Sequence, residues 1–195
     1  MKPFRRVTAR AAVLDRADVD TDQIIPKQFL KRIERTGYGE FLFFDWRQDQ
    51  AFELNRPEYE GAKILLAGPN FGCGSSREHA AWALEDFGFE VVVAPSFGDI
   101  FFSNAVQIGL VPVTLPAAEV KTLMQSVAGG GELTVDLETE SITDPTGRAA
   151  RFQMEPFVRH CLLHGLDSIA RTLQHEPDIA TFEERHPALV ETTSL

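Results

Sequence analysis

Residues 70–79, with the sequence NFGCGSSREH, hold the side chains of this chain that are best suited to chemistry. The glycines on either side of Cys73 allow the backbone to take positive φ and to approach a ligand closely. Ser75 and Glu78 have the spacing of a capping box at the start of a helix. Amides at a helix N-terminus favour an anion, and Arg77 adds a planar donor fork suited to a carboxylate. The segment therefore predicts an anion site where a turn enters a helix.

Other interpretations of this segment fit its residues less well. It lacks the Lys-Ser/Thr ending of a P-loop and the Gly-x-Gly-x-x-Gly spacing of a dinucleotide site. It also differs from the Gly-x-Ser-x-Gly nucleophile elbow. Cys73 would act as a nucleophile only beside a positioned base, whereas His79 is expected to pack on the helix. A capping box without any ligand remains the simplest alternative.

The composition is that of an ordinary globular protein. The chain has 195 residues, of which 44% are hydrophobic and 25% charged, and its formal net charge is −10. The acidic excess disfavours a nucleic-acid or anionic-membrane surface. No apolar run reaches the length of a membrane span, and the N-terminus lacks the apolar core of a signal peptide. We therefore expect a soluble cytoplasmic protein.

The two cysteines, Cys73 and Cys161, are far apart in the sequence. Zinc and iron–sulfur sites normally use three or four protein ligands, which this pair does not supply. Two cysteines also provide no disulfide framework, which favours a reducing compartment. We therefore expect this chain to bind no metal and no cofactor by itself.

Short apolar runs alternate with helical segments along most of the chain. Strands are predicted at residues 7–14, 63–67, 91–94 and 111–115, and helices at residues 75–87, 99–108 and 119–127. This alternation predicts an α/β core with at least partly parallel strand pairing. Shorter strands are predicted at residues 133–137, 141–143 and 151–153, and two or three helices follow from residue 156.

The segment at residues 70–79 resembles the signature of the 3-isopropylmalate dehydratase small subunits, in the aconitase superfamily. Residues 18–26, DVDTDQIIP, resemble the first loop of that family. Residues 96–104 and 109–112 resemble its second sequence block, and residues 160–170 resemble the ending of its longer bacterial form. The resemblance covers nearly the whole chain.

This resemblance implies a swivelling β/β/α domain that closes over a partner. The swivel α/β domain is expected at residues 1–155, with a mobile substrate loop at about 28–44. Residues 156–195 are expected to form a helical extension packed on the same domain. The implied partner is a large catalytic subunit that carries a [4Fe-4S] cluster. The resemblance implies that this chain is active only in a heterodimer with that subunit.

The implied reaction belongs to leucine biosynthesis. A hydro-lyase dehydrates 2-isopropylmalate to 2-isopropylmaleate and rehydrates it to 3-isopropylmalate. By the resemblance, Ser75 is the catalytic base, and Arg77 stabilises the base and pairs with a substrate carboxylate. Ser76 and Gly74 are expected to contact the substrate, and Asp22 matches an acidic position of the family's first loop.

Residues 28–44 resemble the loop by which relatives select the side chain of their substrate. Phe29, Leu30 and Ile33 offer apolar contact for an isopropyl group. The nearby Lys31 carries a positive charge, which would also suit a substrate with a further carboxylate. One alternative is therefore a small subunit for another 2-hydroxy diacid, of the citramalate or dimethylmalate type. The other is a stand-alone anion-binding module.

Overall fold

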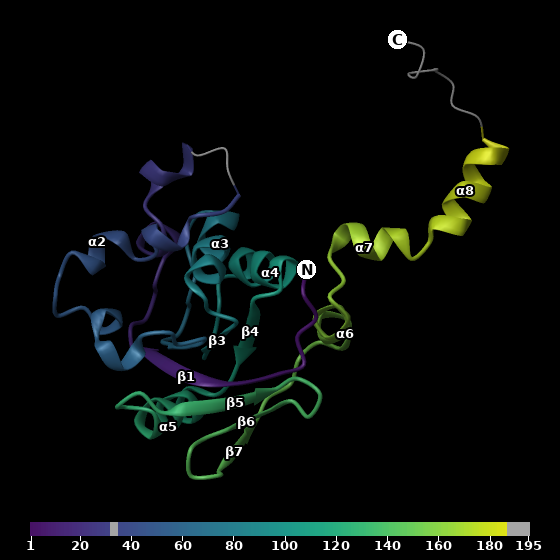
Figure 1. Ribbon diagram of the computed structural model, residues 1–195. Helices are drawn as coiled ribbons and strands as arrows, with labels where there is room; N and C mark the ends of the chain where they lie inside the picture. The colour runs from purple at the N-terminus through teal and green to yellow at the C-terminus, as the bar shows by residue number, and fades with distance from the viewer. Residues whose placement is uncertain (32–34, 187–195) are drawn as a thin grey trace.

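The fold is seen in a computed structural model that describes residues 1–31 and 35–186 (Figure 1). Its seven-stranded sheet has the order β4-β3-β2-β1-β5-β6-β7. The strands are β1 (Arg6–Leu14), β2 (Ile64–Ala67), β3 (Val91–Ala94), β4 (Val111–Thr114), β5 (Glu132–Asp136), β6 (Ser141–Thr143) and β7 (Ala149–Arg151). Strands β1 to β4 pair in parallel, and β5 to β7 continue antiparallel from β1. The predicted partly parallel α/β core is confirmed.

Helices cover the parallel strands on both faces. They are α1 (Thr21–Ile24), α2 (Phe44–Arg47), α3 (Glu78–Phe87), α4 (Asp99–Ile108), α5 (Ala117–Ser126), α6 (Pro156–His164), α7 (Ser168–Leu173) and α8 (Glu176–Arg185). Short 3-10 helices occupy Lys27–Lys31, Gly39–Phe41, Glu53–Asn55 and Pro57–Tyr59. None of the helices in the described ranges is long and apolar enough to cross a membrane.

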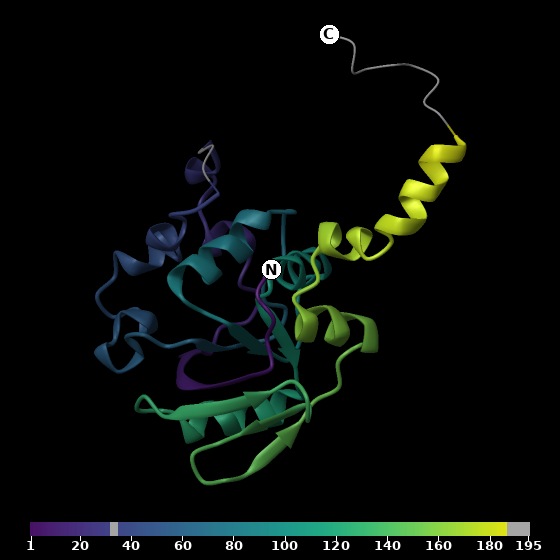
Figure 2. The same cartoon turned by 45° about the vertical axis from the view of Figure 1, so that its right-hand side comes forward.

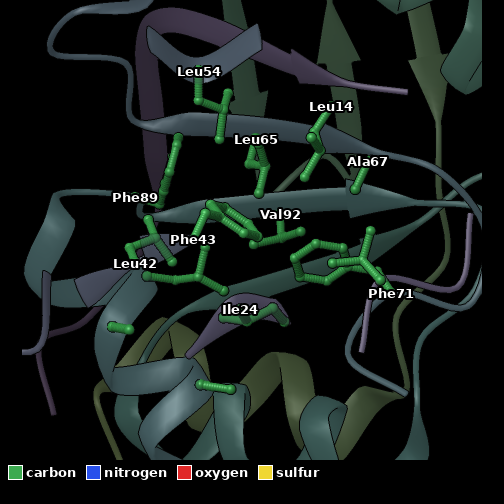
Figure 3. Packing of buried hydrophobic residues seen from close by; sticks show 14 of the residues in the cluster. Leu14, Ile24, Leu42, Phe43, Leu54, Leu65, Ala67, Phe71, Phe89 and Val92 are labelled. Atoms are coloured by element: carbon green, nitrogen blue, oxygen red, sulfur yellow. The ribbon is translucent and has the colours of Figure 1, made fainter. Parts of the chain in front are cut away.

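Two hydrophobic clusters lie on opposite faces of the sheet, because successive strand side chains point to opposite sides. Leu65 and Val92 face the first cluster, which includes residues of α3 and α4 and of the segment that follows β1 (Figure 3). Leu66 and Val93 face the second cluster, with α5, β5 and β6. All residues of β2 and β3 are buried, as expected for parallel strands covered on both faces. These two strands provide a rigid base for the loops at their ends.

The loops that follow β1, β2 and β3 meet at the carboxyl ends of these parallel strands. The Gly72 amide donates to the Val19 carbonyl at 2.7 Å, which joins the second loop to the first. The Phe71 amide donates to the Ser96 carbonyl at 3.0 Å, which joins it to the third. Ligands of open α/β sheets bind at this edge. The fold therefore brings residues 70–79 to the place where a ligand is expected.

The C-terminal helices differ in how they pack. Helix α6 lies on the domain, where Leu162 is fully buried and its carbonyl accepts from the Phe4 amide at 2.9 Å. Helices α7 and α8 contain no buried residue and lead away from the body (Figures 1 and 2). Ile169 is 70% exposed and Phe182 is 61% exposed. Packing of the whole extension on the domain therefore stays a prediction, because helical periodicity does not say what covers an apolar side.

Candidate active site

The turn between β2 and α3 depends on two glycines with positive φ, Gly72 at +73° and Gly74 at +91°. A Cβ atom on Gly72 would lie 2.2 Å from Cγ of Phe101 in α4. A Cβ atom on Gly74 would lie 3.3 Å from Cβ of Asp20. The turn is therefore held closely between α4 and the loop that follows β1, and Gly72 has no room for a side chain.

We expect Gly72→Ala to lower the free energy of unfolding by about 3 kcal/mol, because it combines left-handed backbone strain with overpacking against Phe101. Gly61→Ala is the matched control, since Gly61 has φ +70° and open space around its Cβ position. Strain alone predicts a loss of about 1 kcal/mol there. Urea unfolding measures both losses, and equal losses would contradict the close packing of the turn.

Helix α3 begins later than predicted, at Glu78, and its N-cap is Arg77. The Arg77 side chain makes no capping hydrogen bond. The predicted capping box of Ser75 and Glu78 is therefore wrong. The reason is that the Ser75 carbonyl accepts from the Thr21 hydroxyl, at 2.9 Å, and Arg77 has an extended backbone conformation immediately before the helix.

The tip of the turn presents polar groups to solvent. Gly74, Ser75 and Ser76 are exposed. Within the described ranges, their amides and the two serine hydroxyls have no hydrogen-bond partner. Hydrogen-bond donors of this kind suit an anion. The anion site at the turn stays a prediction, but its donors come from the loop rather than from a helix that starts at Ser75.

Asp22 and Arg77 are distant in the sequence and form an ion pair in the structure. Asp22 is 51% exposed, whereas the Arg77 side chain is only 14% exposed. The Arg77 guanidinium lowers the pKa of the Asp22 carboxyl, so the pair is charged at neutral pH. The atom of Arg77 that contacts the Asp22 carboxylate is Nη1, which is buried. Two of the predicted site residues are thus in contact.

The two other reactive side chains of the segment have environments that suit packing. Burial raises the pKa of the Cys73 thiol, and the Asp20 carboxylate raises it further. A thiol held in its protonated form is a poor nucleophile. The His79 ring centroid lies 5.2 Å from that of Tyr38 and 4.6 Å from that of Trp82. Burial lowers the pKa of His79, in agreement with its expected packing on the helix.

Phe29 and Leu30 lie half-buried in the 3-10 helix that follows α1. The ring centroids of Phe29 and Phe41 are 4.1 Å apart in a stacked pair, and Phe44 meets Phe29 edge-on at 4.9 Å. These contacts join Phe29 to the segment that follows it rather than to the turn. Ile33 lies outside the described residues. Substrate contact by these three residues stays a prediction.

Polar residues of three loops also support the turn through contacts that no local pattern predicted. The Asn70 side chain donates to Asp18 at 2.8 Å, and the Asn70 amide donates to the Ser96 hydroxyl at 2.8 Å. Asn70 has φ +58°, a left-handed conformation that asparagine tolerates better than most residues. The asparagine before Phe-Gly is the local sequence feature that indicates a left-handed residue here. Its hydrogen-bond partners are not indicated, because they are distant in the sequence.

The fold and the site together define a class of protein. A parallel half-sheet extended by antiparallel strands, with a glycine turn at its carboxyl edge, is the swivel domain of the aconitase superfamily. The family model described as the aconitase C-terminal domain matches residues 1–118. A second model, LeuD_N, matches residues 121–156. A third, described as the C-terminal domain of the 3-isopropylmalate dehydratase small subunit, matches residues 169–188.

Similar proteins cover nearly the whole chain. The 3-isopropylmalate dehydratase small subunit of Acidobacterium capsulatum is 56% identical over 188 residues, which are 95% of this chain and 91% of that protein. The one from Geobacillus kaustophilus is 53% identical over 193 residues, 95% and 98% of the two chains. A crystal structure of 3-isopropylmalate dehydratase from Methanocaldococcus jannaschii is 26% identical, with a TM-score of 0.69 over 91% of this chain and 99% of that one. This chain belongs to the family of 3-isopropylmalate dehydratase small subunits, and the predicted fold class is confirmed.

Proposed function

We propose that this chain is the small subunit of a hydro-lyase that converts 2-isopropylmalate to 3-isopropylmalate through 2-isopropylmaleate, in leucine biosynthesis. The names of relatives that match 95% of the chain support this activity. The observation that carries the proposal is the contact of Asp22 with Arg77 beside the exposed Ser75, at the carboxyl edge of the parallel strands. This arrangement offers a base and a carboxylate clamp on one side of a substrate.

Ser75 is proposed as the base. Its oxygen, as an alkoxide, removes the proton from the carbon next to a carboxylate, and the electrons of that C–H bond form the double bond as the neighbouring hydroxyl leaves. Water then adds with the opposite orientation. A serine anion is unfavourable in water, so it requires donors that are already in place. The unengaged amides of the turn and the Arg77 guanidinium are such donors.

Arg77 and Ser76 are proposed to bind a substrate carboxylate. A guanidinium donates from more than one edge, and its planar fork matches the two oxygens of a carboxylate. Asp22 engages one nitrogen of Arg77. The substrate therefore uses another edge or displaces Asp22. Gly74 has no side chain, which allows the carboxylate to approach the backbone.

The leaving hydroxyl needs a Lewis acid, and we propose that a large subunit brings it. In the described part of the chain, no three His, Cys, Asp or Glu side chains are grouped to hold a metal ion. Cys73 and Cys161 are both free. The resemblance assigns a [4Fe-4S] cluster to the large subunit, where it would polarise the substrate hydroxyl. Free thiols suit the cytoplasmic location that is part of this proposal.

The division of the chain is also part of the proposal. Residues 1–155 are the swivel domain that closes over the large subunit, with a substrate loop at about 28–44. Residues 156–195 are the C-terminal extension. A family match that ends at residue 156 and another that begins at residue 169 support this boundary.

Reconstitution tests the proposal. The purified chain, the large subunit and their mixture are each supplied with 2-isopropylmalate, and formation of the unsaturated diacid is followed by its ultraviolet absorbance. We expect turnover in the mixture only, and slower turnover of citramalate and dimethylmalate. Turnover by the chain alone would contradict the two-subunit proposal. A preference for citramalate would assign a related dehydratase, and binding of a dicarboxylate without turnover of any substrate would indicate an anion-binding module.

A further inference from the structure

Thr21 makes two hydrogen bonds to the turn that carries Ser75. It is the first residue of α1, in the segment that follows β1, and is only 2% exposed. Its amide donates to the Cys73 carbonyl at 2.9 Å. Its hydroxyl donates to the Ser75 carbonyl, also at 2.9 Å. One buried residue therefore engages the carbonyls on both sides of Gly74.

The hydroxyl contact begins where the backbone pairing stops. Residues 19–21 run parallel to the turn, with a backbone hydrogen bond from Gly72 to Val19 and a bridge between Asp20 and Cys73. The positive φ of Gly74 then turns the chain out of this pairing. The side chain of Thr21 spans the resulting gap and reaches the next carbonyl, that of Ser75.

These two contacts also decide where the neighbouring amides point. In a trans peptide, the C=O group and the following N–H group point in opposite directions, and the described chain contains no cis peptide. Because the carbonyls of Cys73 and Ser75 point toward Thr21, the amides of Gly74 and Ser76 point away from it. Neither amide has a hydrogen-bond partner among the described residues, and both residues are exposed. Both donors therefore lie on the open side of the turn.

We propose that Thr21 is a positioning residue for the reaction, which sets the orientation of Ser75 and of the amides beside it. Thr21 does not touch the substrate. It acts by holding the peptide units of the turn so that the Ser75 oxygen and its donors face the substrate side. The proposal rests on the proposed function, in which Ser75 is the base.

Thr21→Val keeps the shape of the side chain and removes the hydroxyl. In the reconstituted two-subunit enzyme we expect kcat to fall on the order of 10²-fold, since a displaced catalytic group costs about that much. The value of KM is expected to change much less than kcat. Thr21→Ser restores the hydroxyl and is expected to recover most of the turnover. Thr122→Val is the control, because the Thr122 hydroxyl makes the same kind of bond, to the Ala118 carbonyl at 2.9 Å, far from the turn in α5.

A double mutant separates a positioning role from a general effect on stability. If Thr21 acts through Ser75, then Thr21→Val causes no further loss of turnover in a Ser75→Ala background. A full additional loss there would overturn the proposal, as would normal turnover of Thr21→Val or a failure of Thr21→Ser to recover activity. If Thr21→Val does not fold, Thr21→Ala removes the same hydroxyl and carries the same expectations. Normal turnover of Ser75→Ala alone would instead reject Ser75 as the base, so the two failures are distinguishable.

Discussion

Replacing Ser75 with alanine is expected to lower kcat of the reconstituted enzyme by about 10³-fold, because general-base catalysis contributes about 10²–10⁴-fold. The variant keeps the amides of the turn and the Arg77 clamp, so substrate affinity should change little. Steady-state turnover of 2-isopropylmalate measures the loss. A pH profile of the remaining activity that no longer rises with pH as the wild type does would support the removal of the base.

The stability of the same variant provides an independent check. Because the Ser75 side chain does not cap α3, its removal should leave the free energy of unfolding unchanged, whereas loss of an N-cap costs about 1 kcal/mol. Ser126→Ala is the matched control, since the Ser126 hydroxyl bonds the Leu123 carbonyl at 2.8 Å at the end of α5. That control should keep full turnover. A stability loss without a loss of turnover in Ser75→Ala would restore the capping interpretation and contradict the catalytic one.

Replacing Arg77 with lysine is expected to lower kcat/KM by about 10²-fold, equivalent to roughly 2.7 kcal/mol. Lysine keeps the positive charge but lacks the planar fork that binds two carboxylate oxygens at once. The loss should appear in both KM and kcat, because Arg77 is proposed to bind the substrate and to stabilise the Ser75 anion. Inhibition by a dicarboxylate that lacks the leaving hydroxyl should weaken in parallel, which separates binding from chemistry.

Arg148→Lys is the control for this variant. Arg148 also pairs with a carboxylate, that of Glu119, and its side chain is 40% exposed and far from the turn in sequence and fold. An exposed pair of this kind contributes about 0–1 kcal/mol, so little change is expected. If Arg77→Lys behaved like Arg148→Lys in turnover and inhibition, Arg77 would be part of the scaffold and not of the carboxylate clamp. Unfolding curves of both variants show whether a loss of activity reflects loss of structure.

Local patterns were sufficient for much of the fold. The apolar runs at β2 and β3 are short, continuous and bounded by turn residues, which is the pattern of strands buried on both faces. The helix predicted at residues 99–108 has the bounds of α4 because glycines precede and follow it. Predictions were less accurate where pairing between distant segments decides the outcome. The strand predicted at residues 151–153 is observed at Ala149–Arg151, where its register is set by β6.

The start of α3 shows why a correct motif still gave a wrong local structure. Ser-x-x-Glu is a valid capping pattern, but a cap requires the Ser75 carbonyl to enter the helix. In the folded chain that carbonyl accepts from the hydroxyl of Thr21, the first residue of α1. A working capping box occurs instead at α1, where Asp20 accepts from the Gln23 amide at 2.8 Å. The competing bond comes from a distant segment, so no pattern within residues 70–79 revealed it.

The sequence by itself indicated the family and the turn at which we propose the chemistry, because the glycines, serines and arginine of that turn are contiguous. It also predicted that this chain builds no metal cluster by itself, since two separated cysteines are too few ligands for one. Only the tertiary structure decided that Asp22 pairs with Arg77 and that Thr21 supports Ser75. The physical reason is that these contacts join loops after different parallel strands, and the distance between such loops is set by sheet pairing and not by any local pattern.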